Sequence, residues 1–289
     1  MCIRDSGIAT YQGYMGVFRW MIELGRMDII TEVSQLSSFQ AMPREGHLEA
    51  CYHIFAFLKK NPHQSVVMHP SRIQVKESRF KDREDWTDFY GDIKEDILAD
   101  MPEPLGVSVK ITAFVDANHA GNVVTRRSQT GYVFYVNNAP ILFSSKRQNT
   151  VEASTFGSEF IAMRTVSEVN DIIRYKLRMF GVPIDGPTDI LCDNQSVTNS
   201  AQRPESTLSK KHLSICYHRV RESVAKQACR IGKVTDEENV SDLFTKILGI
   251  PKRDRCLEQL VWRERHSIRD CHQTKDVTLN RQSMDRQRE

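Results

Sequence analysis

The sequence predicts an α/β fold: a mixed five-stranded sheet with flanking helices, preceded by a mostly helical segment. Two patterns support this prediction. From residue 107 onwards, three strand patterns come first and then helices and strands alternate, which is typical of a sheet that starts as an antiparallel meander. Before residue 70, apolar residues instead recur at helical spacing. With 289 residues, of which 40% are hydrophobic, the chain can bury a sizeable core and form about two domains.

The first segment, residues 8–80, is predicted to be mostly helical. Ile29, Val33 and Leu36 recur at helical spacing, and a second apolar stripe runs through residues 48–60. Nine acidic residues follow between Asp82 and Glu103, together with two prolines. Residues 81–106 are therefore expected to form an exposed acidic linker.

The first strand of the predicted sheet, residues 107–116, ends on a candidate ligand. Its apolar residues alternate with polar ones, which is typical of a half-buried strand, and the pattern stops at Asp116. A carboxylate at the end of a core strand is held rigidly and still meets solvent, which suits a metal ligand. The simpler interpretation is an aspartate that caps a turn.

The remaining elements follow from turn signals and periodicity. Asn137 and Asn138 separate two apolar runs and indicate a hairpin. The polar residues 263–289 lack apolar periodicity and are predicted to be a disordered tail. The domain of residues 107–250 is expected to contain, after its first strand, strands or helices at residues 130–136, 140–145, 154–180, 188–192, 194 onwards, 208–229, 231–234 and 240–248.

Three more carboxylates lie at comparable places. Glu159 falls within the apolar stripe of the helix at residues 154–180, where an ionised side chain is costly unless it is paired or binds metal. Asp193 follows a core strand as Asp116 does, although it also suits a helix N-cap. Asp242 comes three residues after the expected N-cap Asn239 and points away from the apolar side of its helix, so a capping-box role stays open.

Such a set of carboxylates at strand ends and helix starts is what two-metal hydrolysis of a phosphodiester requires. The net charge of +3 argues neither for nor against a nucleic-acid partner. Seven cysteines without paired spacing predict reduced thiols in an intracellular protein. No apolar run approaches ~18 residues, so no membrane span is expected.

Six motifs occur in order between residues 116 and 246. They resemble the C-terminal part of the reverse transcriptase–ribonuclease H region of copia-type LTR-retrotransposon polyproteins. The motifs are D-A-N-H-A-G (116–121), T-R-R-S-Q-T-G-Y-V-F (125–134), S-S-K-R-Q-N-T-V-E-A-S-T-F-G-S-E-F-I-A (144–162), C-D-N-Q-S (192–196), K-K-H-L-S-I-C-Y-H-R-V-R-E (210–222) and N-V-S-D-L-F-T-K (239–246).

The resemblance implies a ribonuclease H-like fold with Asp116, Glu159, Asp193 and Asp242 as catalytic and metal-binding residues. Two Mg²⁺ ions, with Mn²⁺ as a substitute, would serve hydrolysis of the RNA strand of RNA–DNA hybrids during reverse transcription. Y-Q-G-Y-M-G (11–16) and nearby motifs resemble the thumb and connection. The implied partner is the upstream reverse transcriptase palm of the same polyprotein, in a cytoplasmic retroelement particle. Polymerase activity is not expected, because the palm's paired-aspartate motif is absent from this chain.

Basic and polar residues provide the predicted nucleic-acid contacts, because a loop arginine near a phosphodiester site can bind a strand phosphate. A solvated surface is the alternative for each of them. The predicted contacts are Arg126, Arg127, Ser128, Lys210, Lys211 and His212.

Several alternatives remain open at this stage. Glu152 is a second acid near the start of the long helix, but only Glu159 lies on the apolar stripe. The spacing of His212, Cys216 and His218 does not match a zinc site. The loop at residues 234–239 lacks the histidine that cellular ribonucleases H carry. The chain could also be a decayed, non-catalytic nucleic-acid-binding fragment, or a transposase or integrase core.

Overall fold

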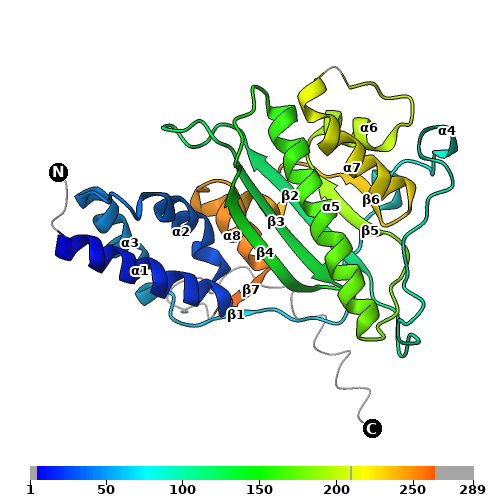
Figure 1. The fold of residues 1–289 in the computed structure, drawn as a ribbon. Coiled ribbons are helices and arrows are strands. Elements are labelled where there is room, and N and C mark those ends of the chain that lie inside the picture. The colour runs from blue at the N-terminus through cyan, green and yellow to red at the C-terminus, as the bar shows by residue number, and fades with distance from the viewer. Residues whose placement is uncertain (1–4, 209, 264–289) are drawn as a thin grey trace, which may run out of the picture.

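The computed structural model describes residues 5–208 and 210–263, and its centre is a five-stranded mixed sheet (Figure 1). The strand order is β4-β3-β2-β5-β6. Strands β2, β3 and β4 form an antiparallel meander, whereas β5 runs parallel to β2 and β6 runs parallel to β5. The predicted mixed five-stranded sheet is therefore confirmed. The strands are β2 (Ile111–Asn118), β3 (Gln129–Val136), β4 (Ala139–Arg147), β5 (Thr188–Cys192) and β6 (Cys229–Lys233).

One face of the sheet is covered by the long helix α5 (Thr155–Met179) and by α7 (Ser214–Ala225), with α6 (Gln195–Gln202) beside them (Figure 1). Alternate residues of β2, among them Ala113 and Val115, pack against Phe160 and Met163 of α5. Helix α5 begins where the sequence predicts, because the Ser154 hydroxyl accepts a hydrogen bond from the Gly157 amide.

The opposite face is covered by the predicted helical segment and by elements between residues 240 and 260. A second core joins Phe114, Tyr135 and Leu191 of the sheet to residues such as Phe18 and Phe244. These layers consist of α1 (Asp5–Glu23), η1 (Met27–Ile29), α2 (Ile30–Leu36), η2 (Ser37–Phe39), α3 (Glu45–Lys60), η5 (Val240–Phe244) and α8 (Ile250–Glu258).

The double covering corrects the prediction for the first strand. Strand β2 begins at Ile111 rather than at residue 107, and Val107 is 87% exposed. Seven of its eight residues are buried, so β2 is not half-buried. The reason is that each of its two faces packs against a layer of helices.

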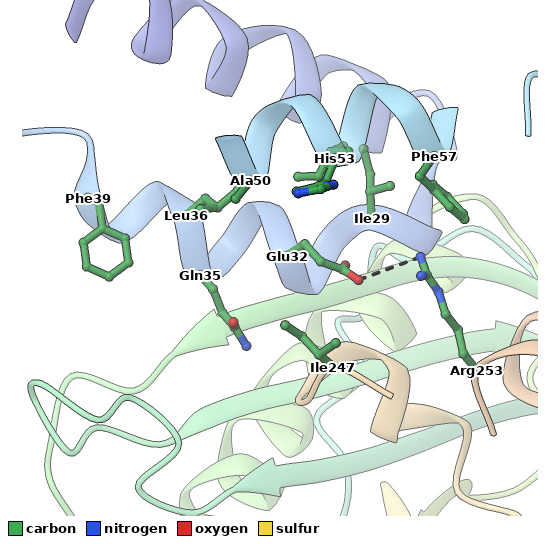
Figure 2. Close-up of a pocket in the computed structure, with 11 residues that line it drawn as sticks. Ile29, Glu32, Gln35, Leu36, Phe39, Ala50, His53, Phe57, Ile247 and Arg253 are labelled. Atoms are coloured by element: carbon green, nitrogen blue, oxygen red, sulfur yellow. Dashed lines mark ion pairs between the residues drawn. The ribbon is translucent and has the colours of Figure 1, made fainter. Parts of the chain in front are cut away.

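A strand pair and the contacts of Arg253 help to bind the N-terminal helices to the C-terminal part. Strand β1 (Gln64–Val66) pairs antiparallel with β7 (Val261–Arg263). Figure 2 shows Arg253 of α8 reaching across to Glu32 of α2, with 3.8 Å between their charged atoms, at the edge of a cavity of about 360 Å³. The guanidinium of Arg253 also donates to the Asp28 carbonyl and lies over the Phe57 ring. The sequence patterns predicted neither α8 nor β7.

The acidic segment at residues 81–106 is largely exposed but is anchored at two points, Trp86 and Glu95. Near its start, the short helix α4 (Thr87–Tyr90) follows η3 (Glu77–Arg79). The buried Trp86 directly precedes α4, and its ring stacks on the guanidinium of Arg221. Further on, the Glu95 carboxylate accepts hydrogen bonds from Arg174 and Arg178 of α5. Burial alone would raise the pKa of Glu95, but these two arginines outweigh it and lower the pKa to about 2.

One predicted helix is shorter than expected. Instead of a single helix over residues 208–229, the structure has η4 (Lys211–Leu213) and then α7. Gln227 adopts φ = 62°, so the chain leaves the helix there and Cys229 already belongs to β6. No helix in the described part of the chain is both long and apolar enough to cross a membrane. The predicted tail at residues 263–289 lies outside the described residues beyond Arg263.

Phe244→Ala tests whether the two predicted parts share one core. Phe244 is fully buried, stacks on Phe143 of β4 and belongs to the core that includes α1. Truncating such a residue should lower the free energy of unfolding by ~3–5 kcal/mol in a single transition. Denaturant unfolding measures this, with Ile250→Ala, a 75% exposed position, as a control expected to stay within ~0.5 kcal/mol. Two separate transitions, of which only one shifts, would contradict the shared core.

Candidate metal centre

The first two carboxylates meet because their strands are neighbours. Strands β2 and β5 run parallel, with Phe114 opposite Leu191. Asp116 and Asp193 each come two residues later and therefore reach the same edge of the sheet. Asp116 is 7% exposed and lies on the face of β2 that Phe114 shares, which is the face covered by η5. The predicted convergence of the two strand-end aspartates is present.

The third carboxylate comes from η5, which lies directly on the sheet. Gly131 of β3 is the strand partner of Asp116, and a side chain there would come within 2.7 Å of Phe244 Cβ. Glycine at this position therefore allows η5 to approach. Asn239 fixes the start of η5: its amide nitrogen donates to the Val115 carbonyl, and its side-chain oxygen accepts from the Ser241 amide. Asn239 is thus the predicted N-cap.

Asp242 is fully buried, at 0% exposure, contrary to the interpretation that it points away from the core. That interpretation assumed an α-helix, with ~100° between successive residues. The structure instead has a five-residue 3₁₀ helix, whose three-residue turn places side chains differently, and all five of its residues are buried.

Three carboxylates form one cluster. Asp116, Asp193 and Asp242 each offer an oxygen, and these three oxygens lie within 4.8 Å of one another. Glu159 is not part of this cluster. It lies half-buried in the first turns of α5, where it receives a hydrogen bond from Asn194 and feels the charge of Asp193. Of the four predicted ligands, the structure brings three together and leaves Glu159 beside them.

Burial of like charges shifts the acidity of the cluster. Burial and then the charge of Asp242 raise the pKa of Asp116 to about 7, although a hydrogen bond from the Thr245 hydroxyl opposes the shift. Burial, followed by the charge of Asp242, also raises the pKa of Asp193. Burial raises the pKa of Glu159 to about 7. Asp116, Asp193 and Glu159 therefore bind protons more tightly than exposed carboxylates do.

Two lysines neutralise part of this charge, and the sequence patterns did not identify them. Lys246 Nζ lies 2.6 Å from one oxygen of Asp242 and 3.9 Å from an oxygen of Asp116. The Lys252 ammonium contacts the other oxygen of Asp242 and lies 2.7 Å from Asp236. Lys246 could have been found, because it follows Asp242 at the i,i+4 spacing of helical ion pairs. Lys252 gave no signal, because α8 was not predicted.

The donor set fits a hard divalent cation. It consists of carboxylate oxygens alone, and Mg²⁺ and Mn²⁺ prefer oxygen ligands to softer sulfur ligands. Both oxygens of Asp242 are buried and accept no hydrogen bond of regular geometry. A buried carboxylate that has only cations for partners is suited to a metal ion.

The predicted contacts in the loop after β2 differ in exposure. Arg126 is exposed and adopts φ = 55°, and Arg127 is half-buried. The loop is closed by hydrogen bonds between Asn122 and the backbone of both arginines. Ser128 is fully buried, and its hydroxyl accepts from the Ala120 amide. Arg126 is therefore open to solvent, Arg127 is partly covered, and the buried Ser128 supports the loop.

The second predicted group lies near the start of α5. The Lys210 ammonium contacts the hydroxyl of Ser154, the N-cap of α5, and Lys211 is exposed. His212 Nε2 lies 3.0 Å from Glu152 Oε2. Glu152 is thus paired with His212 and does not belong to the carboxylate cluster.

No protein-family model matches the chain. It is 26% identical over 239 residues to the retrovirus-related Pol polyprotein from transposon RE1 of Arabidopsis thaliana, an alignment that covers 83% of this chain and 14% of that polyprotein. It is 28% identical over 148 residues to the corresponding polyprotein from transposon TNT 1-94 of Nicotiana tabacum, covering 51% of this chain and 11% of that one. The N-terminal ribonuclease H domain of Rv2228c from Mycobacterium tuberculosis is 15% identical, with a TM-score of 0.37, and the match covers 52% of this chain and 98% of that one.

The chain therefore spans about one seventh of the length of the first of these polyproteins. The six motifs predicted a resemblance of this kind, and the comparisons confirm it: the chain is similar to retrovirus-related Pol polyproteins of transposons.

Proposed function

We propose that this chain hydrolyses the RNA strand of RNA–DNA hybrids at the carboxylate cluster. The observation that carries the proposal is the meeting of Asp116, Asp193 and Asp242, from two strand ends and a 3₁₀ helix, with oxygens within 4.8 Å. Three acids in and around a buried site are costly to hold together unless a cation joins them. The substrate class rests on the transposon Pol relatives, since reverse transcription of RNA produces such hybrids.

The proposed cofactors are two Mg²⁺ ions, with Mn²⁺ as a substitute. Asp116, Asp193 and Asp242 would hold them, with Glu159 completing the ligand set from α5. When bound, the ions supply an activated water and stabilise the leaving oxygen. The protein contributes rigidity: Asp116 lies in a core strand, and the Thr245 hydroxyl donates a hydrogen bond to it.

The substrate is proposed to lie across the end of β2, with its phosphates near the exposed loop. Arg126 and Arg127 belong to the loop that leaves the end of β2, the strand that carries Asp116. Guanidinium groups bind phosphate well, and such contacts position a nucleic acid without reading its sequence. Lys211 is a further exposed cation near the start of α5.

The larger context is also a proposal. Residues 8–80 are proposed as a thumb and connection segment, 81–106 as a linker and 107–250 as the ribonuclease H-like part. An upstream reverse transcriptase palm of the same polyprotein, in a cytoplasmic particle, would then deliver the hybrid. Helix α8 and strand β7 follow this part from residue 250 onwards, and β7 pairs with β1 of the N-terminal segment.

The cleavage assay uses a labelled RNA–DNA hybrid with Mg²⁺ or with EDTA. The wild-type chain should cut the RNA strand only with the metal. Asp116→Asn and Glu159→Gln should each lose more than ~100-fold in rate, because even groups that only orient metal ligands cost ~10–100-fold when removed. Asp185→Asn, a surface carboxylate paired with Arg72, is the matched control and should cleave normally. A folded wild-type chain that leaves the hybrid intact would identify a non-catalytic fragment, and cleavage of duplex DNA instead would indicate a transposase-like core.

The pKa values predict how stability depends on pH without metal. The pKa of Asp116 is about 7 in the folded protein, raised by burial and by Asp242, against ~4 in an unfolded chain. A pKa raised by folding contributes stability that is complete below pH ~4 and is lost as pH rises through 7. Between pH 6 and 8 in EDTA, the wild type should therefore lose on the order of 1 kcal/mol through Asp116.

Asp116→Asn cannot ionise and should lose less stability over the same interval. Denaturant unfolding at pH 6 and pH 8 measures the difference, and Asp185→Asn should follow the wild type. The same loss of stability in Asp116→Asn as in the wild type would mean that Asp116 is not the group that binds the proton.

The arginine loop is tested by the salt dependence of binding. Replacing Arg126 and Arg127 together by alanine should weaken hybrid binding and make its salt slope shallower by ~0.9 for each phosphate that is no longer bound. The paired control, Arg83→Ala with Lys94→Ala, removes two exposed cations from the acidic segment. The slope of this control should match that of the wild type. If both double variants have the wild-type slope, Arg126 and Arg127 do not bind phosphate.

A further inference from the structure

The most deeply buried carboxylate of the site has two lysines as partners. Asp242 is fully buried, and each of its oxygens faces a different ammonium group. Lys246 follows shortly after η5, whereas Lys252 comes from the separate helix α8. A metal ion that used both oxygens of Asp242 would have to replace both lysines.

The two lysines are held very differently. Lys252 bridges Asp242 and Asp236, and its side chain is 26% exposed. It stands on α8, which is anchored in the core through Cys256 and Leu257. Lys252 thus stands on a fixed helix and has two anionic partners, Asp242 and Asp236.

Within residues 5–208 and 210–263, the ion pairs of Lys246 are with carboxylates of the cluster alone. Its ammonium lies 2.6 Å from Asp242 and 3.9 Å from Asp116, and its side chain is 38% exposed. It therefore sits between two of the three clustered carboxylates, at the place that an ion shared by them would need. A long, partly exposed side chain can turn into solvent at little cost.

We propose that Lys246 is the resident counter-ion of the cluster and is displaced by a divalent metal, whereas Lys252 stays and keeps Asp242 in place. This inference rests on the proposed function, because it concerns the same metal site. Without metal, the positive charge of Lys246 offsets the repulsion among the three carboxylates. With metal, the ion takes over this task. Metal binding is then weakened by the ion pair that must first be broken.

The experiment measures Mn²⁺ binding in the absence of nucleic acid, from the electron paramagnetic resonance signal of free Mn²⁺. Lys246→Met should bind Mn²⁺ roughly tenfold more tightly than the wild type, because one close ion pair need not be broken before the metal binds. In EDTA, the same variant should melt at a lower temperature, because the cluster has lost its counter-ion. Lys252→Met should bind Mn²⁺ no more tightly than the wild type. Lys94→Met, which removes an exposed lysine paired with Asp92, should match the wild type in both measurements.

A second variant covers the case in which Lys246→Met does not fold without metal. Lys246→Gln keeps a hydrogen-bond donor without the charge and should also bind Mn²⁺ more tightly. If Lys246→Met unfolds in EDTA and regains cooperative melting with Mn²⁺, the counter-ion role is supported. If both variants stay unfolded with Mn²⁺, Lys246 is a permanent structural partner and the proposal is overturned.

Hybrid cleavage separates this inference from the proposed function. Equal Mn²⁺ affinity in the wild type and Lys246→Met, together with normal cleavage by the wild type, overturns the lysine inference alone. Tighter binding by Lys252→Met but not by Lys246→Met overturns the assignment of the two roles. If neither folded protein binds Mn²⁺ and the wild type does not cleave, both proposals fail.

Discussion

Repulsion among three clustered carboxylates is the constraint around which this end of the structure is built. Asp116, Asp193 and Asp242 lie close enough for burial and mutual charge to raise the pKa of the first two. Nothing in the side chains themselves favours that arrangement. It is imposed by the parallel pairing of β2 with β5 and by the approach of η5 over Gly131. The two lysines then offset part of the charge, so the fold tolerates an arrangement that the carboxylates alone would oppose.

The N-terminal helices contribute to this site without supplying a ligand. The buried hydroxyl of Thr31 in α2 donates a 2.6 Å hydrogen bond to the carbonyl of Leu243, the residue after Asp242. Arg253 of α8 donates to the Asp28 carbonyl and is one residue from Lys252. The N-terminal helices thus hold η5, which carries Asp242, and α8, whose Lys252 contacts Asp242. They also cover Phe114, Tyr135 and Leu191, which would otherwise leave an apolar face of the sheet in water. The position of Asp242 therefore depends on packing between segments more than 200 residues apart.

The parts of the site that could be predicted are those whose sequence patterns lie within a few residues of the ligand. Asp116 lies near the end of β2 and Asp193 directly follows β5. The patterns of these strands are visible within a few residues, and their parallel pairing brings the two aspartates together. Asp242 was placed on the wrong side of its helix because apolar periodicity at ~100° per residue does not apply to a 3₁₀ helix. The burial of β2 on both faces could not be read from its alternation, since the face of Phe114 is covered by α1 to α3, η5 and α8, all of which lie far from β2 in the chain. Lys252 depends wholly on tertiary contact, and no local pattern marks it.

The same electrostatics account for the separate position of Glu159. The cluster already holds three carboxylates against the charges of two lysines, so a fourth carboxylate in contact would add repulsion without a new partner. Glu159 instead receives a hydrogen bond from Asn194. The side-chain oxygen of Asn194 also accepts from the amides of Ser196 and Val197 and so caps α6. This arrangement keeps Glu159 beside Asp193, with its pKa near 7, at the border between the cluster and solvent. A divalent cation brings the positive charge that the cluster lacks, and it is this charge, rather than any change in the fold, that would make a fourth carboxylate favourable there.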